Sequence, residues 1–494
     1  MVIARIFQQA HQTPDKTAAV YNGVTCSYAR FAQRVEACRR YLARQELRPR
    51  SVAVIDIPHR LDAWIVGFAL RDLGHTTLAV PDAETLDALR LRDVGCVVRT
   101  ADDERPPSNS SSSPRSIRVP AATHDAADGV AVPAYREAAA PAGGHIMMTS
   151  GTTGVYKMVV RDAAMEARAL PLHARINEIS GQSIVYIANF GLWTAGGYRW
   201  PLITWSEGGT VIMHAQPDVH APLVRHDMTH IFATPGTLAH LLRAPAGALR
   251  RNDSTQLMVT GGALPLSLLE NARRRVTRRV YAVLASTEAL TVAVTPLVGP
   301  DDLIWHRIHP SREVQVVDEA GNVLGPGSEG SVRIRIIDGL AGYRDDDAAT
   351  RMFFRDGYFH PGDIGVLGDD GRLSLRGRAS DVINILGDKI ATGTIEQVLQ
   401  DELGATGVCI LSIGNAGTAD EIYIVIEVRR PLQPEVVKSA ANPALGLLKR
   451  IPVHALLVEK LPRNATGKID RRLLRQQLAD ALDANSGQRS TRLA

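Results

Sequence analysis

Long apolar runs and closely spaced cysteines are both missing from this chain of 494 residues. No apolar segment reaches the roughly 18 residues that a membrane-spanning helix needs, and residues 1–16 lack the apolar core of a signal peptide. The 4 cysteines form no CxxC pair, so the sequence predicts neither a disulfide framework nor structural zinc. We therefore expect a cytoplasmic protein without a membrane span.

An excess of charge of one sign is also absent. The chain has 56 Lys and Arg residues against 52 Asp and Glu residues, which gives a net charge of +4. This near balance does not favour a nucleic-acid partner. The one local basic run, residues 272–280, has the pattern of a solvated helix face. The length itself predicts about two to four domains.

The first hundred residues alternate between two kinds of apolar pattern. Residues 30–47 and 61–74 have apolar side chains at helical spacing, and Gly74 is a typical helix stop. Residues 51–57 and 75–81 are short β-rich runs. A strand, a helix and a second strand in succession predict a parallel α/β sheet.

The pattern of predicted strands and helices changes twice further along the chain. More strand-like runs separated by helical stretches follow between residues 181 and 260, and alternating strands with Asp/Gly/Asn turns begin at about residue 311. Beyond residue 381 the pattern is compact α+β. We expect residues 105–116, which are polar and of low complexity, to form a surface loop or a mobile linker.

These patterns give the predicted fold class. It is α/β, with a large N-terminal domain of parallel-type α/β sheets, a small β-barrel-like subdomain, and a small α+β C-terminal domain.

The stretch TSGTTGVYKMV, residues 149–159, combines hydroxyls, glycines and one lysine. Glycine lets backbone N–H groups turn toward a phosphate and lysine adds charge, so the stretch fits an anion cradle. Taken alone, it fits a surface turn with a chance lysine equally well. A P-loop kinase or NTPase is disfavoured, because Val155 and Tyr156 separate Gly154 from Lys157 and Met158 follows the lysine.

Four further stretches follow in order: LASTEAL at 284–290, YFHPGDIG at 358–365, GRASDVINILGDKIATGTIE at 377–396 and LPRNATGKIDR at 461–471. Together with TSGTTGVYK, they resemble the adenylate-forming superfamily, which includes acyl-CoA synthetases, stand-alone adenylation domains of peptide synthesis, and luciferases. The resemblance extends over nearly the whole chain. One such loop is a weak signal, whereas five ordered motifs are a strong one.

The resemblance implies a site for ATP. The phosphate-loop residues that would wrap the β- and γ-phosphates are Thr149, Ser150, Gly151, Thr152, Thr153, Gly154 and Lys157. Thr287 would bind the α-phosphate, and Glu288 would hold Mg²⁺, a cation that prefers oxygen ligands. Asp363 would accept hydrogen bonds from both ribose hydroxyls. The adenine would pack against Gly261, Gly262 and Ala263.

The resemblance also implies roles for residues 377–471. Arg378 would contact ribose or phosphate, and Ser380 stands at the hinge of a mobile C-terminal domain. This hinge places the N-terminal domain at residues 1–379 and the C-terminal domain at residues 380–494. Gly387 would leave room for the pantetheine arm of a thiol acceptor. Lys468 would bridge the carboxylate and the α-phosphate while the acyl-adenylate forms, so we name Lys468, Thr287 and Glu288 as catalytic.

The sequence departs from the family pattern at several positions. Tyr156 replaces the usual proline before the loop lysine, and Leu284 and Ala285 stand where Tyr-Gly is common. Residues 189–197 contain no gating histidine, so Phe190 and Trp193 are the candidates for lining the acid pocket together with Leu284 and Ala285.

The function that follows is a two-step ligase reaction. ATP would activate a small carboxylic acid to acyl-AMP, and a thiol would then displace AMP. CoA is the preferred thiol because no carrier-protein domain is fused here, and the phosphopantetheine of a separate carrier protein is the alternative. A non-catalytic nucleotide-binding homologue is a further alternative, which the intact Lys468, Glu288 and Asp363 disfavour. We expect a monomer or a homodimer.

Overall fold

The protein is described by a computed structural model. It covers residues 2–82, 85–86, 89, 91, 93–103, 114–120, 132, 134–135, 142–150, 156–215, 220–245, 247–378, 382–385, 388–413, 421–428, 453–463 and 469–490. Within these ranges, the helices are all too short or too polar to span a bilayer.

A six-stranded sheet is built from consecutive strands in the spatial order β6-β5-β3-β4-β7-β8. Its strands are β3 (Val52–Ile55), β4 (Thr76–Ala79), β5 (Val94–Thr100), β6 (Arg115–Val119), β7 (His145–Ser150) and β8 (Tyr156–Arg161). All neighbours are parallel except β7 and β8. Helix α3 (Arg60–Asp72) connects β3 to β4, which confirms the predicted β-α-β unit, and Gly74 adopts a φ of 86° just beyond the helix.

An eight-stranded sheet has the order β14-β13-β12-β11-β9-β10-β1-β2. Its strands are β1 (Thr17–Tyr21), β2 (Val24–Ser27), β9 (Ile184–Ile187), β10 (Thr210–Met213), β11 (His230–Ala233), β12 (Gln256–Thr260), β13 (Val280–Ser286) and β14 (Leu290–Pro296). The interior neighbours are parallel and the pair at each end is antiparallel. Besides α3, the structure describes these helices before residue 276: α1 (Val2–Gln12), α2 (Tyr28–Ala43), α5 (Ala163–Ile176), α6 (Ala195–Glu207), α7 (Ala221–Arg225), α8 (Pro235–Leu241) and α9 (Leu266–Arg275).

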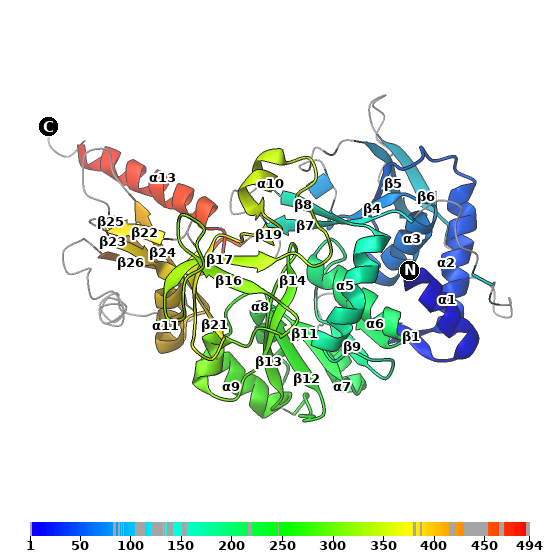
Figure 1. Ribbon diagram of the computed structural model, residues 1–494, viewed down its shortest axis with the longest axis horizontal. Helices are drawn as coiled ribbons and strands as arrows, with labels where there is room; N and C mark the ends of the chain where they lie inside the picture. The colour runs from blue at the N-terminus through cyan, green and yellow to red at the C-terminus, as the bar shows by residue number, and fades with distance from the viewer. Residues whose placement is uncertain are drawn as a thin grey trace.

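One large apolar core joins the two sheets through α1, α2, α3, α5 and α6. It includes Val98 of β5, Val211 of β10 and the aromatic rings of α2, α3 and α6. The Trp205 ring lies 5.0 Å from Phe31 and 5.9 Å from Phe68, measured between centroids. Figure 1 shows α5 and α6 between the strands of the two sheets. Burial of large aromatic side chains stabilises this arrangement.

The third sheet is antiparallel, as the alternating pattern after residue 311 predicts. Its strands are β15 (Trp305–His306), β16 (Val314–Val317), β17 (Glu329–Arg335), β18 (Phe354–Arg355), β19 (Tyr358–Phe359), β20 (Asp363–Leu367) and β21 (Leu373–Arg378). Helix α10 (Asp347–Phe353) precedes β18. Residues of this sheet and of β14 share a smaller apolar cluster.

The last part of the chain is α+β, also as predicted. It contains β22 (Val382–Ile385), β23 (Asp388–Ala391), α11 (Thr392–Leu403), β24 (Gly407–Ile413), β25 (Glu421–Glu427), β26 (Val453–Val458) and α13 (Arg471–Ser490). Strands β24 and β25 are antiparallel, whereas β25 and β26 are parallel. These elements lie together at one end of Figure 1. The predicted boundary at residues 379–380 lies outside the described residues, so the domain limits and the mobility of this part stay predictions.

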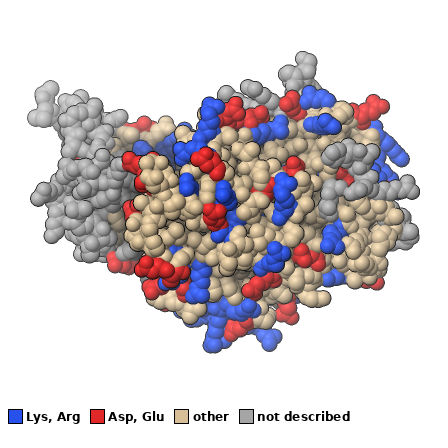
Figure 2. Space-filling view, in the orientation of Figure 1, with Lys and Arg blue, Asp and Glu red and all other residues tan. Residues whose placement is uncertain are grey.

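Two local predictions need correction. The polar segment 105–116 is not a loop to its end, because Arg115 and Ser116 already belong to β6 and pair with β5. The basic run 272–280 is not one helix face, because α9 ends at Arg275; Arg273 donates to the Leu297 carbonyl. On the face that Figure 2 shows, basic and acidic side chains are interspersed.

Candidate active site

The phosphate-loop motif joins two antiparallel strands. Thr149 lies opposite Lys157 in the register of β7 and β8, and Ser150 lies opposite Tyr156. The loop residues Gly151, Thr152, Thr153 and Gly154 are outside the described residues. The hairpin therefore fixes both ends of the predicted phosphate loop.

Lys157 is directed toward two aromatic rings. Its ammonium lies 4.0 Å from the centroid of Phe353 and 5.5 Å from that of Tyr343. A cation above an aromatic face is attracted by the ring quadrupole. Tyr156, which replaces the usual proline, packs with Trp193 against an apolar cluster of the six-stranded sheet.

Thr287 and Glu288 form the turn between β13 and β14. The Ser286 hydroxyl accepts a 2.8 Å hydrogen bond from the Ala289 N–H and closes this turn. Glu288 is buried, and Tyr343 donates from its hydroxyl to Glu288 Oε1 at 2.7 Å. Tyr343 thus contacts both the predicted metal ligand and the lysine of the phosphate loop.

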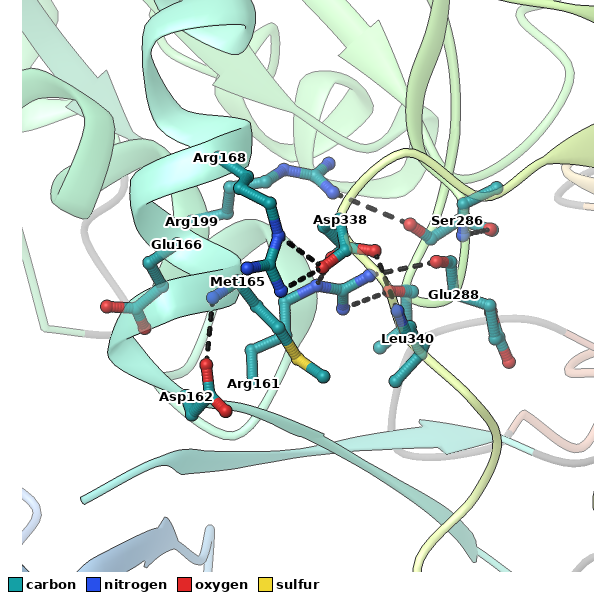
Figure 3. A network of polar contacts seen from close by, with 12 residues as sticks. Arg161, Asp162, Met165, Glu166, Arg168, Arg199, Ser286, Glu288, Asp338 and Leu340 are labelled. Carbon is teal, nitrogen blue, oxygen red and sulfur yellow. Dashed lines mark hydrogen bonds and ion pairs between the residues drawn. The ribbon is translucent and has the colours of Figure 1, made fainter. Parts of the chain in front are cut away.

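Buried arginines donate hydrogen bonds to backbone carbonyls of the same turn (Figure 3). Arg161 donates from Nη1 to the Thr287 carbonyl at 2.6 Å and from Nη2 to the Glu288 carbonyl at 2.8 Å. Its Nε pairs with the Asp338 carboxylate. Arg312 donates to the Ala289 carbonyl at 2.7 Å.

These arginines form a cationic cluster, which we define as Arg161, Arg199 and Arg312. Arg199 is buried and its Nη1 lies 3.5 Å from the Ser286 carbonyl, at the limit of a hydrogen bond. Burial, together with the charges of Arg161 and Arg312, lowers the pKa of Arg199 to about 9. Burial likewise lowers the pKa of Arg312 to about 10. Arg199 and Arg312 are therefore cations at neutral pH.

The charge of the cationic cluster is only partly compensated. Among the described residues, one ion pair involves these arginines, that of Arg161 with Asp338. Positive charge therefore remains beside the turn. The neighbouring His173 does not add to this charge, because burial and the nearby arginines lower its pKa well below the ordinary value. A buried positive region of this kind favours an anion on the other side of the turn.

The predicted ribose and adenine contacts lie on other strand ends. Asp363 opens β20 and is half-buried, opposite Arg378 of β21 in the register. Gly261 and Gly262 follow β12 directly and are exposed with Ala263. Gly261 has a φ of 85°, a backbone conformation that favours glycine.

The four candidates for the acid pocket belong to three packing groups, because Phe190 and Ala285 both pack against the large core. Phe190 packs edge-on against Trp200, with 5.4 Å between centroids, and Trp193 packs against the six-stranded sheet. Leu284 contacts the cluster of the antiparallel sheet, whereas Ala285 contacts the large core. The pairing of β13 with β14 is irregular between these last two residues. Their role as pocket lining stays a prediction.

One hollow of about 410 Å³ lies away from these candidates. It is lined by residues of the β1–β2 hairpin and of the starts of α2 and α3, among them Arg30 and Asp62. None of the predicted site residues lines it. The candidate site is therefore defined by its motifs and contacts rather than by this hollow.

Three further predicted residues, Ser380, Gly387 and Lys468, lie outside the described residues. Their roles as hinge, pantetheine contact and catalytic lysine stay predictions.

The residues present fit a magnesium ion shared with a nucleotide. The described residues contain no group of three or more His, Cys, Asp or Glu side chains that could enclose a metal. Mg²⁺ commonly uses one or two protein carboxylates and completes its ligands with water and phosphate oxygens. Glu288 supplies such a carboxylate, with Tyr343 fixing one of its two oxygens.

Sequence reasoning missed Tyr343, Arg161 and Asp338. The sequence pattern could have pointed to Arg161, because in YKMVVR this residue shares one strand face with Lys157 and ends an apolar run. Its partners could not be found from the sequence pattern, since Asp338 lies 177 residues further along the chain.

The comparisons with known proteins identify the family of the chain. The family model described as "AMP-binding enzyme" matches residues 6–344. The chain is 26% identical to the 2-succinylbenzoate–CoA ligase of Bacillus subtilis, over 96% of this chain and 97% of that protein. It is 23% identical to the 4-chlorobenzoate–CoA ligase of an Arthrobacter species, over 95% and 94% of the two chains.

A solved structure has the same fold. The o-succinylbenzoate CoA synthetase of Bacillus subtilis, in complex with its acyl-adenylate intermediate, matches with a TM-score of 0.80. The identity is 23%, and the match covers 95% of this chain and 97% of that chain.

Proposed function

The chain belongs to the family of AMP-binding enzymes, and from this premise we propose that it is an AMP-forming acid–thiol ligase. Its substrates are ATP, a small carboxylic acid and a thiol. The observation that carries the proposal is the contact of Tyr343 with both Lys157 and Glu288. It joins β8, which follows the phosphate loop, to the metal-ligand turn, which we define as Thr287 and Glu288.

The first step forms the acyl-adenylate. A carboxylate oxygen attacks the α-phosphorus of ATP, and the bond to pyrophosphate breaks. The phosphate loop and Lys157 hold the departing phosphates, while Thr287 donates to the α-phosphate. Lys468 bridges the two anions that are being joined. Fixed donors around developing charge are the main way in which such a site lowers the barrier.

Glu288 and Tyr343 form the part of the site that would hold Mg²⁺. When bound, Mg²⁺ neutralises phosphate charge, and Glu288 is the residue that would hold it. The Tyr343 hydroxyl orients the Glu288 carboxylate, and Asp363 would accept hydrogen bonds from the ribose hydroxyls.

The second step transfers the acyl group to a thiol. The thiol sulfur attacks the acyl carbonyl carbon and AMP leaves. We assign CoA as the thiol, because the two relatives named above are CoA ligases. Residues 380–494 would rotate about Ser380 between the steps, so that Lys468 withdraws and Gly387 approaches the thiol arm. A carrier-protein phosphopantetheine is the alternative acceptor.

We propose a small aryl acid as the carboxylate substrate. The named relatives act on substituted benzoates. The aromatic side chains of Phe190 and Trp193, which are both partly exposed, are suited to contact an aryl ring.

Pyrophosphate release tests the proposal. The protein is incubated with ATP, Mg²⁺ and a panel of aryl and aliphatic acids, and one or more aryl acids should raise the release above the acid-free rate. Adding CoA should then yield a thioester that mass spectrometry detects. Retention of acyl-AMP in the presence of CoA would favour a carrier protein. ATP binding without acid-dependent pyrophosphate release would identify a non-catalytic homologue.

A further inference from the structure

Strand β8 carries two cations on one face. Residues 157, 159 and 161 alternate with the other face of the strand, so Lys157 and Arg161 project to the same side. Lys157 begins this set beside the phosphate loop, and Arg161 ends it beneath the turn of Thr287 and Glu288. One strand therefore connects the phosphate loop to the metal-ligand turn.

Arg161 uses all three of its nitrogens. Nη1 and Nη2 bind two successive carbonyls of the turn, and Nε binds Asp338. The planar guanidinium holds its donors in a fixed fork, so the two carbonyls are fixed relative to each other. Fixed carbonyls set the peptide planes on either side of the Glu288 Cα, and hence the direction of its side chain.

Asp338 extends this connection to Tyr343. The 338–340 segment is a tight turn, in which Gly339 has a φ of 83° and Arg168 donates to the Asp338 carbonyl at 2.7 Å. Five residues after Asp338, Tyr343 donates to Glu288 Oε1. Arg161 thus anchors both the backbone that bears Glu288 and the segment whose tyrosine orients the carboxylate.

We propose that Arg161, paired with Asp338, is a positioning residue that aims the Glu288 carboxylate at the magnesium ion of the bound nucleotide. The inference rests on the proposed function for the role of Glu288. Arg161 itself lies behind the turn and is buried, so it acts through Thr287 and Glu288 and not by contact with substrate. Residues that orient a metal ligand commonly affect metal affinity by about ten- to a hundredfold.

Calorimetric titration of ATP tests this role without catalysis. ATP is titrated into the full chain with no carboxylic acid present, once with Mg²⁺ and once with EDTA, and the ratio of the two dissociation constants is the readout. In Arg161→Gln, we expect this magnesium-dependent ratio to fall about tenfold relative to the native protein, with metal-free ATP affinity nearly unchanged. Arg161→Lys keeps the charge but loses the fork, and should give an intermediate ratio.

A matched control separates positioning from general destabilisation. Arg34 pairs with Asp62 in another buried site, on α2 and α3, away from the turn. Arg34→Gln should lower the melting temperature but leave the magnesium-dependent ratio unchanged. If Arg161→Gln does not fold, the Arg161→Lys ratio decides the matter.

The outcomes are distinct. An unchanged ratio in a folded Arg161 variant, or an equal loss in Arg34→Gln, would overturn the positioning role. A native protein that shows the magnesium effect but releases no pyrophosphate with any acid would contradict the proposed function alone. The ratio in the variants would still decide the role of Arg161.

Discussion

The hydroxyl of Tyr343 donates a 2.7 Å hydrogen bond to Glu288 Oε1, while its ring lies 5.5 Å from the Lys157 ammonium. Tyr343 comes from the segment before α10, Glu288 from the β13–β14 turn and Lys157 from β8. A single tyrosine therefore joins a carboxylate and a cation from parts of the chain more than 50 residues apart.

We expect Tyr343→Phe to weaken adenylation by about tenfold. The change keeps the ring but removes a hydrogen bond to a charged group, which contributes roughly 1.5–3 kcal/mol. Acid-dependent pyrophosphate release is the measurement. Tyr358→Phe is the control, because Tyr358 also donates to a glutamate, Glu313, on the antiparallel sheet. Equal losses in both variants would argue against a role for Tyr343 in the site.

Thr153→Val tests the phosphate loop. Valine keeps the β-branched shape but lacks the hydroxyl donor, so apparent ATP affinity or adenylation rate should fall by about ten- to a hundredfold. Thiol transfer from supplied acyl-AMP should barely change, because pyrophosphate has already left. If the loop were only a surface turn, both half-reactions and the melting temperature would fall together.

Lys468→Ala should separate the two half-reactions. A lysine that bridges two anions matters while they are being joined, so acyl-adenylate formation should fall at least about a hundredfold. Thioester formation from supplied acyl-AMP should stay largely intact. Rapid-quench assays of each half-reaction make the comparison, and parallel losses would refute this division of labour.

Acid sensitivity should depend on His145. Its Nδ1 lies 2.8 Å from Thr77 Oγ1 and its Nε2 lies 3.1 Å from the Leu192 carbonyl, inside the core. Burial and the Arg71 charge lower the pKa of His145 to about 3. Between pH 6.5 and 3 the unfolded chain therefore binds a proton that the folded chain does not. The free energy of unfolding consequently decreases by up to about 1.4 kcal/mol for each unit by which the pH is lowered.

The variant that tests this is His145→Gln, which cannot take up the proton. Between pH 7 and pH 5, its free energy of unfolding should decrease by about 2 kcal/mol less than that of the native protein. Its melting temperature should decline correspondingly less. His11→Gln, at an exposed position of α1, should leave the decline unchanged. Identical declines in all three proteins would exclude His145 as a source of acid sensitivity.

The sequence predicted the elements well because their patterns are local. The apolar periodicity of residues 30–47 corresponds to α2, and the β-rich run at 51–57 contains β3. The division of the strands between two sheets could not be predicted in this way. Strand β1 joins β10 of the larger sheet, whereas β3 begins the smaller one, and that choice depends on packing between distant segments.

The candidate site was predictable only in part, for the same reason. Ordered motifs identified Thr287, Glu288 and Lys157 from their resemblance to a family. The residues that hold them, Arg161 and Tyr343, belong to no motif that the sequence pattern marks. Their importance comes from contacts across 126 and 55 residues of chain, which only the folded structure brings together.

The position of β1 has a consequence for biosynthesis. The Thr210 hydroxyl donates to the Thr17 carbonyl across 193 residues, and β1 pairs in parallel with β10. The six-stranded sheet lies wholly between these two strands in the sequence, from residue 52 to residue 161. On the ribosome, its strands emerge before β10, so we expect this sheet to assemble first. The β1–β2 hairpin would remain an unpaired edge until β10 emerges, and an unpaired strand edge is exposed to aggregation during translation.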